Sequence, residues 1–220
     1  MGRRMRATAG AAYGVLALTE TALTADHRAR PRARLVTKPL LMPALALRFV
    51  SGPHRVGHNG VVAAQCFAWG GDVALLGGSR RAFLTGLGSF LTAHVACIAA
   101  YRRRSSAPVL ATPGRRRFLA AGAVAASGMA LAAGREDRTV VVPVAAYGVA
   151  LTSMVVTAAA IDRDRGRNQV LAGAVLFFVS DTMIGVRAFL AGDRVPGLDA
   201  AVMATYTAGQ WLISEGMTGA

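Results

Sequence analysis

The sequence has little of what a soluble globular protein carries on its surface or uses to crosslink itself. Only 16% of its 220 residues are charged, and these charges gather between long apolar blocks. There are two cysteines, Cys66 and Cys97, both within apolar blocks and without the CxxC spacing of a redox or zinc motif. The motifs of serine hydrolases, zinc proteases and nucleotide-driven pumps are also absent. These absences argue against a disulfide framework, a metal site and those three classes of protein.

Apolar residues are what the sequence has in excess. They make up 54% of the chain, and the mean hydropathy is +0.43. Because such a chain has too little polar surface to cover a soluble globule, we expect its solvent to be lipid. The blocks predict an all-α fold, a polytopic membrane bundle that forms a single integral membrane domain over residues 1–220. About eight transmembrane helices are expected, over residues 7–25, 35–51, 60–77, 82–101, 118–134, 139–161, 168–190 and 199–217.

Positive charge dominates, with a formal net charge of +14. The arginines stand in short clusters at the ends of the apolar blocks, where positive charge sets membrane topology and meets anionic head groups. This placement disfavours a nucleic-acid partner and favours membrane lipids. More arginines flank the N-terminus and the even-numbered loops than the odd-numbered loops, which predicts that both termini are cytoplasmic. The sequence leaves the oligomeric state open.

Two aspartates within the apolar blocks are the strongest functional signal. A charged group in hydrocarbon costs about 2.5–3.5 kcal/mol, so the few that occur there carry information. Asp72 and Asp181 lie on predicted helices that cross the membrane in the same direction, each about 18–20 Å from the same face. We expect the two carboxyls to share one cavity, one as a protonated acid and the other as an ionised base. The structural alternative is that either Asp bonds to a neighbouring helix or pairs with Arg187 or Lys38.

Four further polar residues are candidates for contacts with a substrate. His94 ends a stripe on one face of the predicted helix 82–101, where a catalytic and a packing role are equally compatible with the pattern. Tyr206 and Gln210 are four residues apart, so both face the same way and can contact a head group, water or a neighbouring helix. Lys38 begins the second block, where it can bind a phosphate or snorkel to the interface. Ion pairing or snorkelling is expected for three other charged residues: Glu20, Arg187 and Glu215.

Five short segments together form a recognisable pattern: residues 37–40 (TKPL), 71–76 (GDVALL), 83–94 (FLTGLGSFLTAH), 173–181 and 206–213. In these segments, which span most of the chain, the sequence resembles the YhhN family of lysoplasmalogenase-like, eight-helix membrane proteins. The segments occur in the order of the family. The chain departs from the family pattern at Cys97, where an aromatic residue is expected.

The resemblance implies a bacterial inner-membrane enzyme that acts on a lysophospholipid. It would cleave the vinyl ether bond of a lysoplasmalogen to a fatty aldehyde and a glycerophospho-alcohol, with no metal or organic cofactor. The residues that match the catalytic pair of the family are Asp72 and Asp181, in agreement with their equal depth. The substrate-binding residues implied by the same comparison are Lys38, His94, Tyr206 and Gln210.

Three other functions use the same intramembrane residues. Intramembrane aspartyl proteases also carry two helix-borne aspartates, but their Gly-x-Gly-Asp motif is not matched, because Trp69 occupies the place of the first glycine. In a proton-coupled transporter, Asp72, His94 and Asp181 would form a proton relay. A non-enzymatic lipid-binding protein would keep the fold and the cavity without the chemistry. The sequence by itself leaves these alternatives open.

Overall fold

The computed structural model describes residues 2–25, 31–53, 55–191 and 197–218, and within these ranges the chain is all-helical. The predicted all-α fold class is confirmed for this part of the chain. Each predicted range coincides with a helix, although several ends differ by a few residues. The helices of the described ranges are α1 (Gly2–Ala25), α2 (Pro31–Val50), α3 (His58–Ala74), α4 (Arg80–Arg102), α5 (Pro113–Ala133), α6 (Val141–Ala158), α7 (Arg167–Val186) and α8 (Leu198–Thr218). Short 3₁₀ turns, η1 (Arg138–Val140) and η2 (Arg163–Arg165), precede α6 and α7, and a π-helical segment, η3 (Arg187–Ala191), ends α7.

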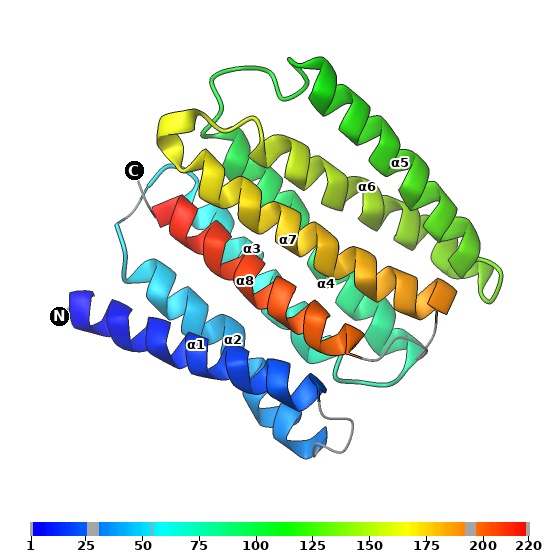
Figure 1. Ribbon diagram of the computed structural model, residues 1–220, viewed down its shortest axis with the longest axis horizontal. Helices are drawn as coiled ribbons and strands as arrows, with labels where there is room; N and C mark the ends of the chain where they lie inside the picture. The colour runs from blue at the N-terminus through cyan, green and yellow to red at the C-terminus, as the bar shows by residue number, and fades with distance from the viewer. Residues whose placement is uncertain (1, 26–30, 54, 192–196, 219–220) are drawn as a thin grey trace.

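The helices close into a ring that does not follow their order in the sequence. Packing contacts join α1 to α2, α2 to α3, α3 to α4, α4 to α6, α6 to α7, α7 to α8 and α8 back to α1. Of the described helices, α5 alone lies outside this ring, packed against α6 at the edge of the molecule (Figure 1). The first turn of α1 meets the last turns of α8, where Arg6 contacts both Glu215 and Thr218. The two ends of the chain therefore lie at the same end of the bundle (Figure 1).

Helix α2 continues through two prolines because a neighbouring helix replaces a lost hydrogen bond. Pro43 has no N–H to donate to the carbonyl of Pro39, four residues earlier in the helix. The indole Nε1 of Trp69, on α3, donates to that carbonyl at 2.9 Å. In a bundle that faces lipid, a freed backbone carbonyl must be satisfied within the protein. The contact also fixes α2 beside the last turns of α3, close to Asp72.

Helices α7 and α8 approach each other closely through two glycines. A Cβ atom added to Gly173 would lie 2.6 Å from the carbonyl oxygen of Gly209, and one added to Gly209 would lie 2.8 Å from that of Gly173. Small residues of this kind let helix backbones pack directly in a membrane. Farther along the same pair, the Ser180 hydroxyl donates to the carbonyl of Val202 at 3.0 Å. This packing places the last turns of α7 against the first turns of α8.

A buried arginine joins four segments at the end of the bundle that holds the termini. Arg104 is 2% exposed, and its guanidinium donates to the carbonyls of Val56, Arg165, Gly216 and Met217 at 2.6–3.1 Å. Burial, followed by the positive charges of Arg55 and Arg165, lowers the pKa of Arg104 from its ordinary value. The last two carbonyls belong to the C-terminal turn of α8, where a cation is favoured. Arg104 thus ties both neighbouring loops to α8.

The charged residues assigned to ion pairing from the sequence are paired. Glu215 lies 2.9 Å from Arg48 Nε and 3.3 Å from Arg6. Glu20 pairs with Arg34 and also accepts a hydrogen bond from Thr37. Arg187 pairs with Asp199 on α8. None of these ion pairs includes Asp72 or Asp181, so they do not neutralise the two aspartates.

The outer surface is apolar along much of its length. Val15, Leu18, Val124, Leu131 and Val142 are each at least 64% exposed. Three of the described helical segments are long and apolar enough to cross a membrane: Arg80–Arg102, Arg138–Ala158 and Arg167–Leu190. An all-helical protein with such segments and such a surface is suited to lipid. The prediction of eight crossings goes beyond these three segments.

Candidate active site

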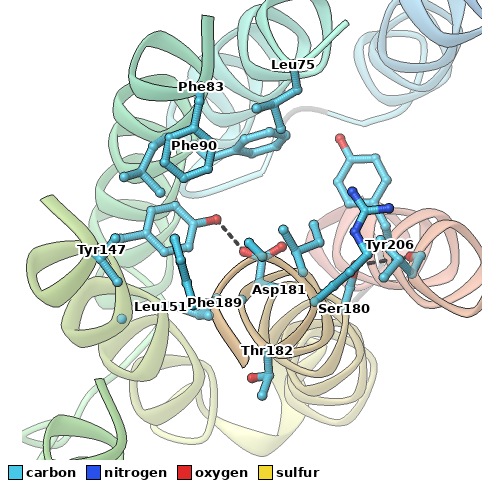
Figure 2. A pocket seen from close by; sticks show the side chains of 18 of the residues that line it. Leu75, Phe83, Phe90, Tyr147, Leu151, Ser180, Asp181, Thr182, Phe189 and Tyr206 are labelled. Carbon is cyan, nitrogen blue, oxygen red and sulfur yellow. Dashed lines mark hydrogen bonds between the residues drawn. The ribbon is translucent and has the colours of Figure 1, made fainter. Parts of the chain in front are cut away.

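One cavity of about 630 Å³ lies in the half of the bundle opposite the termini. It is lined near the C-terminal ends of α1, α3 and α7 and near the N-terminal ends of α2, α4, α6 and α8, with further residues from α5. The volume lies within the range of about 300–1,000 Å³ that is usual for sites of small molecules. Figure 2 shows aromatic and aliphatic side chains around this space, with Asp181 at its centre.

Asp72 lies on the last turns of α3 and has two partners from other helices. The hydroxyl of Tyr206, on α8, donates to Asp72 Oδ2 at 2.6 Å. The ammonium of Lys38, on α2, lies 3.3 Å from Asp72 Oδ1. Asp72 is 2% exposed, so both of its oxygens face protein groups or the cavity. The pairing with Lys38 is one of the structural alternatives that the sequence left open.

Asp181, on α7, has a different set of partners. The hydroxyl of Tyr147, on α6, donates to Asp181 Oδ2 (Figure 2). The Nε2 atom of His94, on α4, lies 3.5 Å from the same oxygen and has no other partner among the described residues. The Asp181 side chain is 8% exposed and that of His94 is 1% exposed. Asp181 is therefore held by one neutral hydroxyl donor and one titratable ring.

A packed set of rings fixes the two aspartate clusters relative to each other. The Phe177 ring centroid lies 5.1 Å from that of His94 and 5.4 Å from that of Tyr206. The His94 ring also meets the Tyr147 ring edge-to-face, at 5.1 Å. These edge-to-face contacts connect the partner of Asp72 with the partners of Asp181. Both carboxyls line the same cavity, so a molecule within it can meet both.

The mouth of the cavity is polar, whereas most of its wall is apolar. Arg34, paired with Glu20, and Arg187, paired with Asp199, stand near the end of the bundle together with Ser79. The wall farther in is formed by Phe83, Leu87, Phe90 and other apolar residues. A site with a charged rim and an apolar interior fits an amphipathic ligand.

The structure places the candidate residues from the sequence in two groups. Asp72, Asp181, Lys38 and Tyr206 line the cavity. His94 and Gln210 are buried but are not among the described residues that line it. His94 lies behind Asp181, and Gln210 lies one turn beyond Tyr206, away from the mouth. The expectation that both side chains line the pocket is therefore not matched by the cavity.

Sequence reasoning missed Tyr147, which donates to Asp181. It stands in the uncharged block 139–161, where no neighbouring charge marks it. The one available signal was a phenol hydroxyl in the middle of an apolar helix, since a buried hydroxyl needs a partner. That signal identifies a bonded residue but does not say which helix holds its partner.

Comparison with known proteins gives a consistent assignment. The family model of the YhhN family matches residues 33–217. Two relatives named lysoplasmalogenase, from Mycobacterium bovis and Mycobacterium tuberculosis, are each 34% identical to the chain over 223 residues, which is 94% of this chain and 80% of the relative. No solved structure matches the chain. Because the family model covers most of the sequence and the identity extends over nearly all of it, the chain belongs to the YhhN family.

Proposed function

We propose that this protein is a membrane-embedded hydrolase that cleaves the vinyl ether bond of lysoplasmalogens. The products are a fatty aldehyde and a glycerophospho-alcohol. The observation that carries the proposal is that two buried carboxyl groups, Asp72 and Asp181, line one cavity with a polar mouth and an apolar wall. The names of the two mycobacterial relatives support the same reaction.

The chemistry of a vinyl ether matches a pair of carboxyls. Protonation at the alkene carbon that is not bonded to oxygen turns the vinyl ether into an oxocarbenium ion. Water then adds to this cation and loses a proton, and the resulting hemiacetal collapses to an aldehyde and an alcohol. The reaction needs a proton donor, a base that directs water and a negative group that stabilises the cation. Two carboxyls in opposite protonation states supply all three.

The two aspartates have different partners, and this difference suggests which one is the proton donor and which one is the base. Asp72 has an ammonium partner, Lys38, whereas the described partners of Asp181 are the Tyr147 hydroxyl and the His94 ring. A nearby cation favours the ionised form of a carboxyl. We therefore assign to Asp72 the ionised role, in which it directs water and stabilises the cation. Asp181 donates the proton to carbon.

The hydroxyls of Tyr206 and Tyr147 act as positioning groups in this scheme. Each donates one hydrogen bond to the Oδ2 atom of one aspartate, which leaves the Oδ1 atom of each carboxyl for other contacts. His94 acts through Asp181, since it is buried behind that carboxyl. Gln210 is buried one turn from Tyr206 and makes no direct contact with the substrate in this scheme.

The test of the reaction is aldehyde release by the purified protein. We expect release from a lysoplasmalogen and none from an ester lysolipid with the same head group and chain length. Release of fatty acid from the ester, without aldehyde from the vinyl ether, would point to a different hydrolase. Proton flux in vesicles without turnover of either lipid would favour the transporter alternative.

Substitution of Lys38 separates two roles for its ammonium group. If Lys38 serves mainly as the cationic partner of Asp72, Lys38→Met should lower kcat by about tenfold or more, since it perturbs a catalytic carboxyl. If Lys38 instead binds the substrate phosphate, the same change should raise KM and leave kcat nearly unchanged. We expect the first result. Arg81→Met, at an exposed arginine outside the described cavity lining, is a control that removes one positive charge at the same end of the bundle.

We also propose that the chain crosses the membrane eight times, with cytoplasmic termini and the cavity mouth on the opposite side. Arg81 and Arg116 are exposed at opposite ends of the bundle. In a variant whose Cys66 and Cys97 are replaced by serine, a membrane-impermeant thiol reagent should label Arg81→Cys in intact cells. It should label Arg116→Cys only after permeabilisation. Labelling of both from one side would contradict eight crossings. Three arginines behind the topology assignment lie outside the described residues: Arg28, Arg30 and Arg194.

A further inference from the structure

The cavity extends beyond the ring of helices. Helix α5 lies outside the ring, yet Ala125, Ala126 and Met129 of α5 line the same cavity as Asp181. Between α5 and Asp181 the cavity is lined by residues of α6, among them Gly148 and Leu151, and of α7, among them Phe178 and Thr182. Thr182, next to Asp181 in the chain, points from α7 in a different direction and also lines the cavity (Figure 2).

The part of the cavity between α5, α6 and α7, which we call the α5 arm, offers almost nothing polar to a ligand. Its wall includes Met129, Leu151 and Phe178. The two hydroxyls along it are already bonded within their own helices. Thr152 donates to the Gly148 carbonyl at 2.8 Å, and Thr182 donates to the Phe178 carbonyl at 2.7 Å. A hydrocarbon can therefore occupy the α5 arm without leaving a hydroxyl donor unsatisfied.

The rest of the cavity orients such a ligand. The charged residues Arg34, Arg187 and Asp199 stand at the mouth, away from the α5 arm. Asp181 stands at the centre of the cavity, between Tyr147 of α6 and Tyr206 of α8 (Figure 2). A molecule with one polar end and one long apolar chain would thus place the bond between these two parts beside Asp181.

We propose that the α5 arm binds the hydrocarbon chain of a single-chain lipid and sets the chain length that the protein accepts. The identification of the lipid as a lysoplasmalogen rests on the proposed function, whereas the binding of one apolar chain does not. The outer face of α5 supports this location, because Val124 is 74% exposed and the helix borders the surroundings of the protein. The chain is held between α5 and the α6–α7 gap, and the head group remains at the mouth.

Gly185 and Met129 both line the cavity and pack against each other, so they limit the size of the α5 arm. A Cβ atom added to Gly185 would lie 3.3 Å from the terminal methyl of Met129 and 3.5 Å from its sulfur. A larger side chain at Gly185 would therefore push Met129 aside and narrow the arm, and truncation of Met129 would enlarge it. Val124→Leu is the matched control, since it adds bulk on the outer side of the same helix.

The experiment measures kcat/KM for lysoplasmalogens with short, medium and long alkenyl chains. Gly185→Leu should lower kcat/KM for the long chain by about tenfold or more relative to the short chain, the usual size of discrimination by pocket volume. Met129→Ala should shift the preference toward longer chains, and Val124→Leu should leave the profile unchanged. An equal effect of Gly185→Leu on all chain lengths, with no shift in Met129→Ala, would overturn the proposal. If Gly185→Leu does not fold, Met129→Ala decides the question alone.

A binding measurement separates this proposal from the proposed reaction. Native mass spectrometry of the purified protein with lysophosphatidylcholines of different chain length reports on the α5 arm without any turnover. If the wild-type protein cleaves no vinyl ether but Met129→Ala still shifts the bound chain length, the chain-binding role of the α5 arm is supported and the proposed reaction is wrong. If vinyl ethers are cleaved but neither variant changes the chain-length profile, the proposed reaction is supported and the chain-binding role of the α5 arm is wrong.

Discussion

Asp72→Asn and Asp181→Asn should each abolish vinyl ether cleavage while the protein stays folded and inserted in the membrane. Asparagine keeps the shape of the side chain but cannot exchange a proton. A general acid or base contributes about 10²- to 10⁴-fold to a rate, so the loss should exceed what a packing contact would give. The measurement is turnover of a lysoplasmalogen by both variants at matched amounts of protein. A variant that keeps more than about a tenth of wild-type activity, well short of this loss, would make its aspartate structural.

A matched control for these variants is Asp137→Asn. Asp137 caps the 3₁₀ turn before α6, and its side chain is 33% exposed. Hydrogen bonds from Thr139, together with the charge of Arg80, lower its pKa. The same substitution there removes one carboxylate without touching the cavity, so turnover should be unchanged.

The wild-type enzyme should also show a bell-shaped dependence of rate on pH, with one limb from each carboxyl of the pair. A single limb would mean that just one of the two groups titrates in the reaction.

Arg104→Ala should cause the largest loss of stability among the substitutions considered. The change removes a buried guanidinium and leaves four carbonyls without their donor, two of them at the C-terminal turn of α8. Hydrogen bonds to charged groups and unsatisfied buried acceptors together give an expected loss of about 3 kcal/mol or more. For a chain of this length that corresponds to a fall in Tm of roughly 6–12 °C. Thermal unfolding in detergent measures it.

The neighbouring Arg103 supplies the control for this experiment. Arg103 is exposed, and no ion pair or side-chain hydrogen bond is recorded for it within the described ranges. Arg103→Ala removes the same charge from the same loop and should leave Tm nearly unchanged. Arg104→Lys should behave like Arg104→Ala, because one ammonium cannot reach four carbonyls in three different segments. Equal Tm values for the Arg103 and Arg104 variants would show that net charge, and not the buried contacts, matters at this loop.

Local sequence patterns predicted the all-α fold class and the similar depth of the two aspartates along their helices. Long apolar blocks specify helices because every backbone group is satisfied within its own segment, whatever lies beside it. Position along a helix then follows from the rise per residue, so Asp72 and Asp181 could be assigned similar depth without knowing their neighbours. The shared cavity was a prediction from that depth, and both carboxyls line it in the structure.

The partners of each group depend on which helices become neighbours, and that was decided by the tertiary structure. Close packing of Gly173 on Gly209 brings α7 against α8, while α5 is left outside the ring and α4 packs on α6. As a result Asp181 meets Tyr147, and Lys38 meets Asp72 while Gln210 lies away from the cavity. Spacing along one helix specifies a face and a depth, but the residue opposite that face belongs to another helix. The sequence therefore determined where the carboxyls stand along their helices, and packing between helices determined what holds them.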